Sequence, residues 1–130
     1  MPMVSKDDNK PFLKIVLRSF GYAIEGISFL LKKERNFKIQ LFVSMVVIFA
    51  SIFFQISKIE WIIVILLMGG MLCIEALNTA IEKTVDLVTE DVQPLAKIAK
   101  DASAGAALIF ASISVIIGLL IFLPYVIALL

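Results

Sequence analysis

Three stretches of this sequence carry no charged residue, and they limit what the chain can fold into more than any other feature. They are residues 41–57, 61–74 and 102–130. A helix needs about 20 mainly apolar residues to cross a bilayer. The third stretch reaches that length alone, and the first two reach it by taking in a few flanking residues. We therefore predict an all-α integral membrane protein whose membrane-spanning helices cover residues 38–57, 60–80 and 102–126.

The composition supports this class and excludes several kinds of chemistry. Hydrophobic residues make up 61% and charged residues 18% of the 130, against about 45–50% and about 25% in soluble domains. This length fits one domain, which we take to be residues 1–130. The formal net charge of +1 argues against nucleic acid as a partner. Because the chain has no histidine and Cys73 is its only cysteine, histidine catalysis, an intrachain disulfide and a thiolate metal site are excluded.

The basic residues predict how the spans are oriented. Eight of the twelve lysines and arginines precede residue 40, and three more lie between residues 83 and 100. The short turn between the first two spans has only Lys58, and the third span has no basic residue. Since Lys and Arg are enriched on the cytoplasmic side, we expect the N-terminus and residues 81–101 in the cytoplasm and the C-terminus outside.

Residues 10–33 have a different pattern. On a helical wheel with 100° per residue, four charged side chains of this segment fall within about 40° of one another. They are Lys14, Arg18, Glu25 and Lys32. The opposite side is apolar and includes Val16 and Ile27. A charged stripe opposite an apolar one predicts an amphipathic helix that lies on the inner membrane surface.

The most informative segment runs from Glu75 to Asp86 and begins inside the second span. On a helix, Glu82 and Asp86 lie within about 20° of Glu75 on either side, and Asn78 lies within about 60°. Inserting an acid at the bilayer centre costs on the order of 2.5–3.5 kcal/mol, so some interaction must offset the cost of placing this polar stripe partly in the membrane. The carboxylates could bind a divalent cation, the deepest acid could transfer a proton, or lysines and a neighbouring subunit could neutralise them.

Two further groups lie on the same side of the membrane as this stripe. Lys100 and Asp101 precede the third span, where Lys100 and the free amides of a helix N-terminus could hold a phosphate. Lysines at this edge also serve as plain topology signals. Glu34 enters the first span within an otherwise basic run. The glycine-rich phosphate loops of soluble kinases do not occur.

The third span also has a face of small residues. Its members are Ala107, Ala111, Ser114 and Gly118. Small residues let helices approach closely in lipid. We therefore predict that this face is a packing seam.

The segment E-A-L-N-T-A-I-E-K-T-V-D, with Lys100-Asp101 downstream, resembles the signature of the small bacterial membrane-embedded lipid kinases. These are the diacylglycerol kinases and their Gram-positive relatives, the undecaprenol kinases. The resemblance extends to Gly21-Tyr22, to Glu34-Arg35-Asn36 and to the three-span layout, so it covers most of the chain. Glu-Arg-Asn and the A-K-D-x-x-A-G-A pattern are similar to the undecaprenol-preferring branch.

This resemblance implies a fold, an activity and a set of site residues. The family has an N-terminal surface helix and three spans, and it works as a homotrimer with shared sites in the bacterial plasma membrane. It uses Mg²⁺ and ATP to phosphorylate a lipid hydroxyl at the cytoplasmic interface. The resemblance implies Glu75 as catalytic base, Glu34 and Glu82 as the acids that hold the metal, and Asn78 and Asp86 as support. The implied ATP contacts are Tyr22, Glu34, Glu82, Asp91, Val92, Gln93, Lys100 and Asp101.

Two positions depart from the diacylglycerol kinase pattern, which has Gly-Ser two residues after the Lys-Asp pair and an arginine near the start of the surface helix. In this chain Ser103-Ala104 occupies the place of Gly-Ser, and Ile15 occupies the place of the arginine. Arg18 can take the role of that arginine only if the alignment is shifted by three residues. The first hypothesis is therefore an enzyme that converts undecaprenol to undecaprenyl phosphate for lipid carrier recycling in cell-wall synthesis. The second is a diacylglycerol kinase that makes phosphatidic acid. The third is a non-enzymatic ion-conducting or scaffold protein whose acidic stripe lines a water path.

Overall fold

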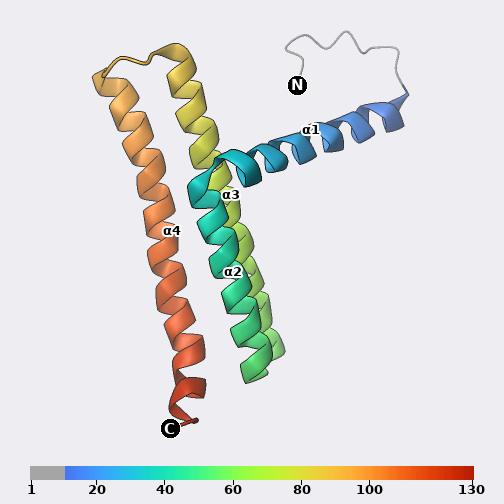
Figure 1. Ribbon diagram of the computed structural model, residues 1–130, viewed down its shortest axis with the longest axis vertical. Coiled ribbons are helices and arrows are strands. Elements are labelled where there is room, and N and C mark those ends of the chain that lie inside the picture. The colour runs from blue at the N-terminus through green and yellow to red at the C-terminus, as the bar shows by residue number, and fades with distance from the viewer. Residues whose placement is uncertain (1–10) are drawn as a thin grey trace. The chain divides into compact units, whose positions relative to one another are not determined.

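A computed structural model describes residues 11–130, and all secondary-structure elements of this part are helices, which short connections join (Figure 1). The helices are α1 (Phe12–Lys33), α2 (Arg35–Phe54), α3 (Lys58–Val88) and α4 (Pro94–Ile127). The last three are each long and apolar enough to cross a membrane, which confirms the predicted class and the three apolar helices. The chain divides into two compact units, residues 1–35 and 36–130. A single domain over 1–130 stays a prediction.

Helix α1 forms the described part of the first unit. It follows Pro11, which has no backbone N–H to leave unpaired at a helix start. The predicted start at residue 10 lies outside the described residues. Glu34 ends the helix in an extended conformation, and its backbone N–H bonds to the Leu30 carbonyl at 3.0 Å. Within α1, Nη2 of Arg18 donates to the Tyr22 hydroxyl at 3.1 Å, so this contact helps to set the direction of the Tyr22 side chain.

Helix α2 ends at Phe54, which is earlier than the predicted limit at residue 57. The Ile56 N–H bonds to the Ser51 carbonyl at 3.3 Å, and the Gln55 N–H bonds to the Ile52 carbonyl at 3.2 Å. This pair of bonds is the Schellman pattern, in which one residue takes the left-handed conformation. Gln55 is that residue, with φ of 50°. The sequence does not predict this helix end, because the left-handed position is occupied by Gln55 and not by the glycine that usually takes it.

Helix α3 begins at Lys58 with a capping box. The Ser57 hydroxyl accepts from the Glu60 N–H at 3.3 Å, and the Glu60 carboxylate accepts from the Ser57 N–H at 2.7 Å. The same carboxylate accepts a hydrogen bond from the Tyr125 hydroxyl of α4 at 2.7 Å. Glu60 therefore fixes both the start of α3 and the position of the far end of α4.

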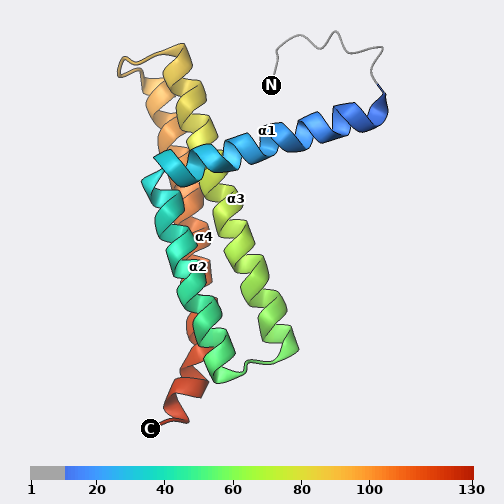
Figure 2. The same cartoon turned by 45° about the vertical axis from the view of Figure 1, so that its right-hand side comes forward.

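Helices α3 and α4 run antiparallel and form the main helix pair of the second unit (Figures 1 and 2). They approach closely at Gly70, where an added Cβ would lie 2.5 Å from Cζ of Phe110. Both helices extend past the predicted spans, α3 to Val88 and α4 from Pro94. Hydropathy predicts only the part of a helix that can lie in lipid, and a helix can continue in polar sequence beyond that part. The start of α4 at Pro94 also fits the preference for proline in the first turn of a helix.

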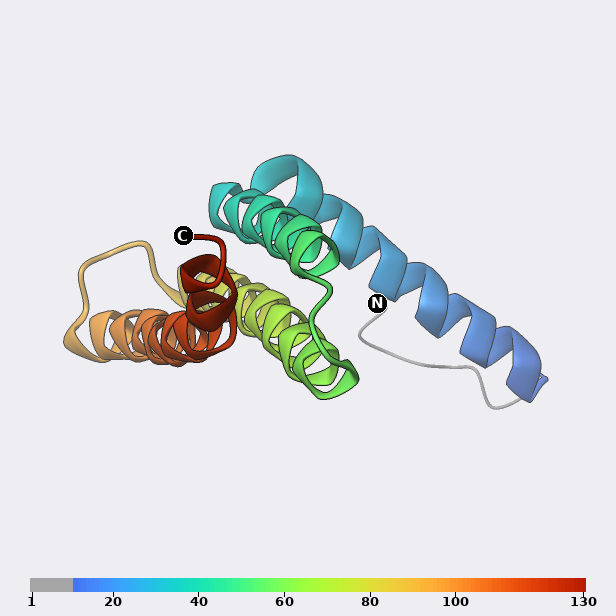
Figure 3. The same cartoon turned by 90° about the horizontal axis from the view of Figure 1, so that it is seen from below.

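The apolar core of the second unit lies near the turn that joins α2 and α3, and Figure 3 looks along the helices from that end. Ile56, Val64 and Ile121 are buried there, with Trp61 and Tyr125 packed against them. Elsewhere the spans bury little of their surface, since only 11% to 17% of the residues in their most apolar windows are buried. Most of the apolar surface therefore remains available to lipid or to other copies of the chain.

Candidate active site

The polar stripe of α3 passes from a buried to an exposed environment. Glu75 and Asn78 are 5% and 6% exposed, and Thr79 beside them is also buried. Glu82 is half-buried and Asp86 is exposed. Within residues 11–130 the Glu75 carboxylate has no hydrogen-bond or ion-pair partner. The predicted polar face is thus confirmed, and its deepest acid is buried without a compensating contact from this part of the chain.

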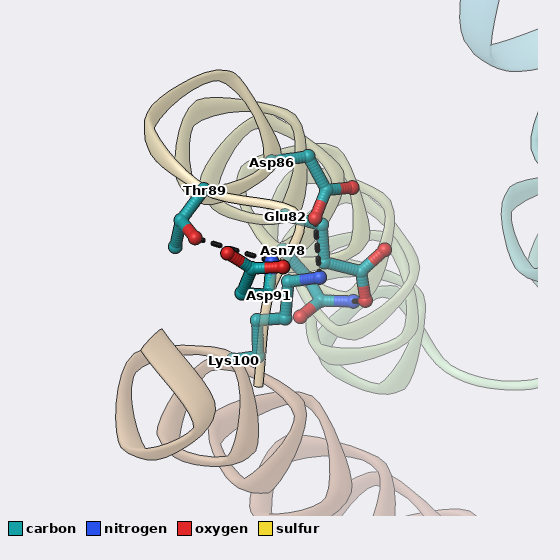
Figure 4. A network of polar contacts seen from close by, with 6 residues as sticks. All are labelled: Asn78, Glu82, Asp86, Thr89, Asp91 and Lys100. Atoms are coloured by element: carbon teal, nitrogen blue, oxygen red, sulfur yellow. Dashed lines mark hydrogen bonds and ion pairs between the residues drawn. The ribbon is translucent and has the colours of Figure 1, made fainter. Parts of the chain in front are cut away.

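Asn78, one turn further along α3, makes a hydrogen bond to the next acid, Glu82 (Figure 4). Its Nδ2 donates to Oε1 of Glu82 at 3.3 Å. Its Oδ1 is buried and has no hydrogen-bond partner in the described part of the chain. A buried acceptor left unpaired costs about 1–3 kcal/mol. The amide therefore orients Glu82 and presents an unused acceptor, which a donor or a cation would satisfy.

Asp86 and Lys100 join the stripe to α4. Figure 4 shows the Lys100 side chain reaching from α4 to the Asp86 carboxylate of α3, where the two form an ion pair. Both side chains remain partly exposed, and an exposed ion pair contributes only about 0–1 kcal/mol to stability. Lys97 instead pairs with Asp101 within α4. The Asp86–Lys100 pair therefore matters mainly because it holds a cation beside two acids, Asp86 and Glu82.

A pocket at the α3–α4 connection brings together residues that the sequence predicted as ATP contacts. They are Asp91, Val92, Gln93, Lys100 and Asp101. Thr89 also lines the pocket, and its hydroxyl accepts from the Asp91 N–H at 3.1 Å (Figure 4). Threonine hydroxyls in turns often accept from the backbone N–H two residues on, so a turn at Thr89 could have been predicted from the sequence, but not that Thr89 lines the pocket. Glu82 lies on the helix that leads to this pocket.

A second cavity contains Glu75. It is lined from α2 by Gln40, from α3 by Met71, and from α4 by Ala107 and Ala111. The sequence predicted the two alanines only as part of a packing seam, and it did not single out Gln40 or Met71. No local signal could have found these two residues, because they come from different helices, α2 and α3, and meet only after the helices pack.

Tyr22 and Glu34 belong to the first unit, so their part in the site stays a prediction. Over residues 11–130 no three His, Cys, Asp or Glu side chains lie close enough together to hold a metal ion. The proposed metal site at Glu34 and Glu82 is therefore a further prediction.

Comparison with known proteins decides the family. The profile of the prokaryotic diacylglycerol kinases matches residues 21–122, which include the whole polar stripe and both pockets. The chain belongs to this family. It is a membrane lipid kinase, and ATP is its co-substrate. Membership excludes the non-enzymatic ion-conducting or scaffold hypothesis and confirms the resemblance found in the sequence.

The relatives differ in how closely they match. The undecaprenol kinase of Bacillus subtilis is 50% identical over 117 residues, which are 90% of this chain and 95% of that protein. The diacylglycerol kinase of Synechocystis is 40% identical over 84% of this chain and 63% of its own length. That of Pseudomonas aeruginosa is 34% identical over 80% of this chain and 83% of its own. The chain is thus more similar to the undecaprenol kinase than to these two diacylglycerol kinases.

Proposed function

We propose that this lipid kinase transfers the γ-phosphoryl group of ATP to undecaprenol and so makes undecaprenyl phosphate, the carrier lipid that cell-wall synthesis recycles. The similarity to the undecaprenol kinase of Bacillus subtilis supports this substrate. So do Ile15 and Ser103-Ala104, which depart from the diacylglycerol kinase pattern.

One observation carries the proposal, namely that the polar stripe of α3 leads from one pocket to another. The Glu75 cavity is at one end, and the pocket with Lys100 and Asp101 is at the other. Glu75 and Asp86 are about 16 Å apart along the helix axis. A lipid hydroxyl would lie at Glu75, and the nucleotide would bind at the α3–α4 connection. Because a triphosphate is elongated, it could extend along the stripe and bring its γ-phosphate toward the lipid hydroxyl.

The chemistry needs a base, a cation and accurate positioning, all of which this chain offers without histidine. Glu75 would take the proton of the lipid hydroxyl while the hydroxyl oxygen forms its bond to the γ-phosphorus. The bond from that phosphorus to the bridging oxygen breaks, and ADP leaves with the electron pair. Phosphoryl transfer depends mainly on placement and charge neutralisation. Lys100 would neutralise phosphate charge, and Asp86 would hold its ammonium group in place.

Glu82, together with Glu34, would hold a divalent metal ion such as Mg²⁺. Carboxylate oxygens are the ligands that Mg²⁺ prefers, and it keeps several waters and phosphate oxygens in its shell. The Asn78–Glu82 hydrogen bond leaves Oε2 of Glu82 available, and Oδ1 of Asn78 is an unused acceptor beside it. The bound metal would neutralise charge that develops on the phosphate oxygens.

We further propose that the N-terminus faces the cytoplasm, that the C-terminus faces outward and that α1 lies on the inner membrane surface. The bias of basic residues supports this orientation. We also propose a homotrimer with shared sites. The low burial within the spans supports assembly, because a single copy leaves most of its apolar helix surface uncovered.

The substrate is tested with purified protein in mixed micelles, given Mg-ATP with undecaprenol or diacylglycerol at equal mole fraction. We expect the higher kcat/KM with undecaprenol. We expect Glu75→Gln to lower kcat by at least about 10²-fold, because it removes the base, while far-UV circular dichroism stays unchanged. Equal or better turnover of diacylglycerol would favour the second candidate, which the names of the Synechocystis and Pseudomonas relatives suggest. Full activity of Glu75→Gln would rule out the assigned base.

A further inference from the structure

We infer that Thr89 is a positioning residue for the nucleotide, because its hydroxyl holds the turn between α3 and α4 in the shape that forms the ATP pocket. This inference rests on the proposed function, in which ATP binds at the α3–α4 connection, and it deepens that function. It gives a role in nucleotide binding to a residue that neither the sequence pattern nor the family resemblance singled out.

The turn supplies half of the pocket lining. Residues 89–93 connect Val88, the last residue of α3, to Pro94, the first residue of α4. All five of them line the pocket, and the other five lining residues come from the adjoining ends of the two helices. The shape of the pocket therefore depends on the conformation of the turn.

Side-chain packing contributes little to holding this turn. Residues 90–93 are exposed, and Val92 is 91% exposed although it is apolar. Thr89 is the one residue of the turn that is half-buried. A segment with few buried apolar contacts opens easily. The hydrogen bonds of the turn are therefore what keeps this wall of the pocket in place.

Thr89 makes two of these hydrogen bonds. It is the extended C-cap of α3, and its N–H donates to the Val85 carbonyl at 2.9 Å. Its hydroxyl accepts from the Asp91 N–H at 3.1 Å (Figure 4). Further along, the Gln93 N–H donates to the Asp91 carbonyl at 2.9 Å, and Gln93 is the N-cap of α4. Thr89 thus ties the end of α3 to Asp91, which is tied in turn to the start of α4.

The bond to the Thr89 hydroxyl is the one that depends on a side chain. Gln93 makes no side-chain bond to the start of α4, and the other hydrogen bonds of the turn join backbone groups. Without the hydroxyl the turn would take up further conformations. ATP would then have to order the turn as it binds, and ordering a loop costs part of the binding free energy.

The distance to the reacting atoms separates this role from catalysis. With a rise of ~1.5 Å per residue, Thr89 lies about 21 Å beyond Glu75 along the axis of α3. A group so far from the transferred phosphoryl group contributes equally to binding in the ground state and in the transition state. Its loss therefore raises the KM for ATP and leaves kcat unchanged.

The test compares Thr89→Val with Thr84→Val. Both replace the same side chain near the same end of α3, but the Thr84 hydroxyl donates to the Ala80 carbonyl of its own helix at 2.7 Å, and Thr84 does not line the pocket. The full chain in micelles is titrated with the non-hydrolysable analogue AMP-PNP and Mg²⁺ in a calorimeter, and initial rates are measured with undecaprenol. We expect Thr89→Val to raise the Kd of AMP-PNP and the KM for ATP about three- to tenfold, the effect of one hydrogen bond. We expect kcat and the undecaprenol KM to stay unchanged, and Thr84→Val to behave as the wild type.

Two further variants show whether the hydroxyl itself is responsible. Thr89→Ser keeps the hydroxyl, so we expect it to recover most of the affinity, whereas Thr89→Ala should bind AMP-PNP as weakly as Thr89→Val. A merely structural role would lower stability or kcat, and serine would not restore them.

The inference is overturned if Thr89→Val binds AMP-PNP as tightly as Thr84→Val, if Thr89→Ser binds it as weakly as Thr89→Val, or if kcat falls while the KM for ATP stays the same. Failure of the proposed function would look different. If ATP did not bind at this pocket, Lys100→Met would also leave the Kd of AMP-PNP unchanged, because Lys100 lines the same pocket. If undecaprenol were not the substrate, the binding measurement would still stand, since it contains no lipid substrate.

Discussion

The close approach of α3 and α4 gives the sharpest test of this structure. A Cβ added at Gly70 would lie 2.5 Å from Cζ of Phe110 and 3.2 and 3.3 Å from its two Cε atoms. The neighbouring Gly69 has no atom within 4 Å of an added Cβ. Replacing each glycine by alanine therefore changes the helix in the same way, and only Gly70→Ala makes a clash. Phe110 stands between Ala107 and Ala111, so this contact also sets the spacing of the helices at the Glu75 cavity.

The size of the effect follows from these distances. Carbon atoms in contact prefer about 3.5–4.0 Å, so the ring or the helix must move by about 1 Å. Overpacking of this kind costs roughly 1–3 kcal/mol, and forcing the ring off its rotamer about 0.5–1.5 kcal/mol. Both substitutions gain about 0.8–1.0 kcal/mol of helix propensity, which cancels in their comparison. We expect Gly70→Ala to be about 1–3 kcal/mol less stable than Gly69→Ala.

The assay is reversible unfolding in mixed micelles by increasing the fraction of a denaturing detergent. Trp61 is the single tryptophan and packs against the apolar core, so its fluorescence reports unfolding. A double-mutant cycle with Phe110→Ala isolates the contact, since Gly70→Ala should cost nothing once the ring is absent. If Gly70→Ala is as stable as Gly69→Ala, or if its cost persists without the ring, the helices do not approach as described.

Two further predictions concern other parts of the second unit. Gln55→Gly should raise the free energy of unfolding by about 1 kcal/mol, because glycine relieves the left-handed conformation at the end of α2; an unchanged or lower value in the same assay would contradict the Schellman geometry. Lys100→Met should raise the KM for ATP severalfold, whereas Lys97→Met should raise it less, because Lys97 pairs within α4 and Lys100 reaches the acids of α3. A larger effect of Lys97→Met would argue against Lys100 as the phosphate ligand.

The sequence alone predicted much of the site on α3, because one helix face is a local property. Glu75, Asn78 and Glu82 fall on one side of any helix that contains them, and the structure buries that side or turns it toward α4. Lys100 was a candidate phosphate ligand from its place before the third span, whereas the loop residue Asp91 came only from the resemblance. The end of α2 was missed, because Gln55 adopts a conformation that its residue type does not signal.

The sequence determined that this chain is an all-helical membrane protein with three spans and an acidic stripe, because hydropathy and helical periodicity depend only on the order of residues. The sequence also indicated the family, because the motif from Glu75 to Asp86 is one continuous segment. Only the tertiary structure decided that Lys100 reaches Asp86, that Phe110 packs on Gly70, and that Gln40 shares a cavity with Glu75. Each of these joins residues from different helices, and such contacts depend on how the helices pack, which no local pattern specifies.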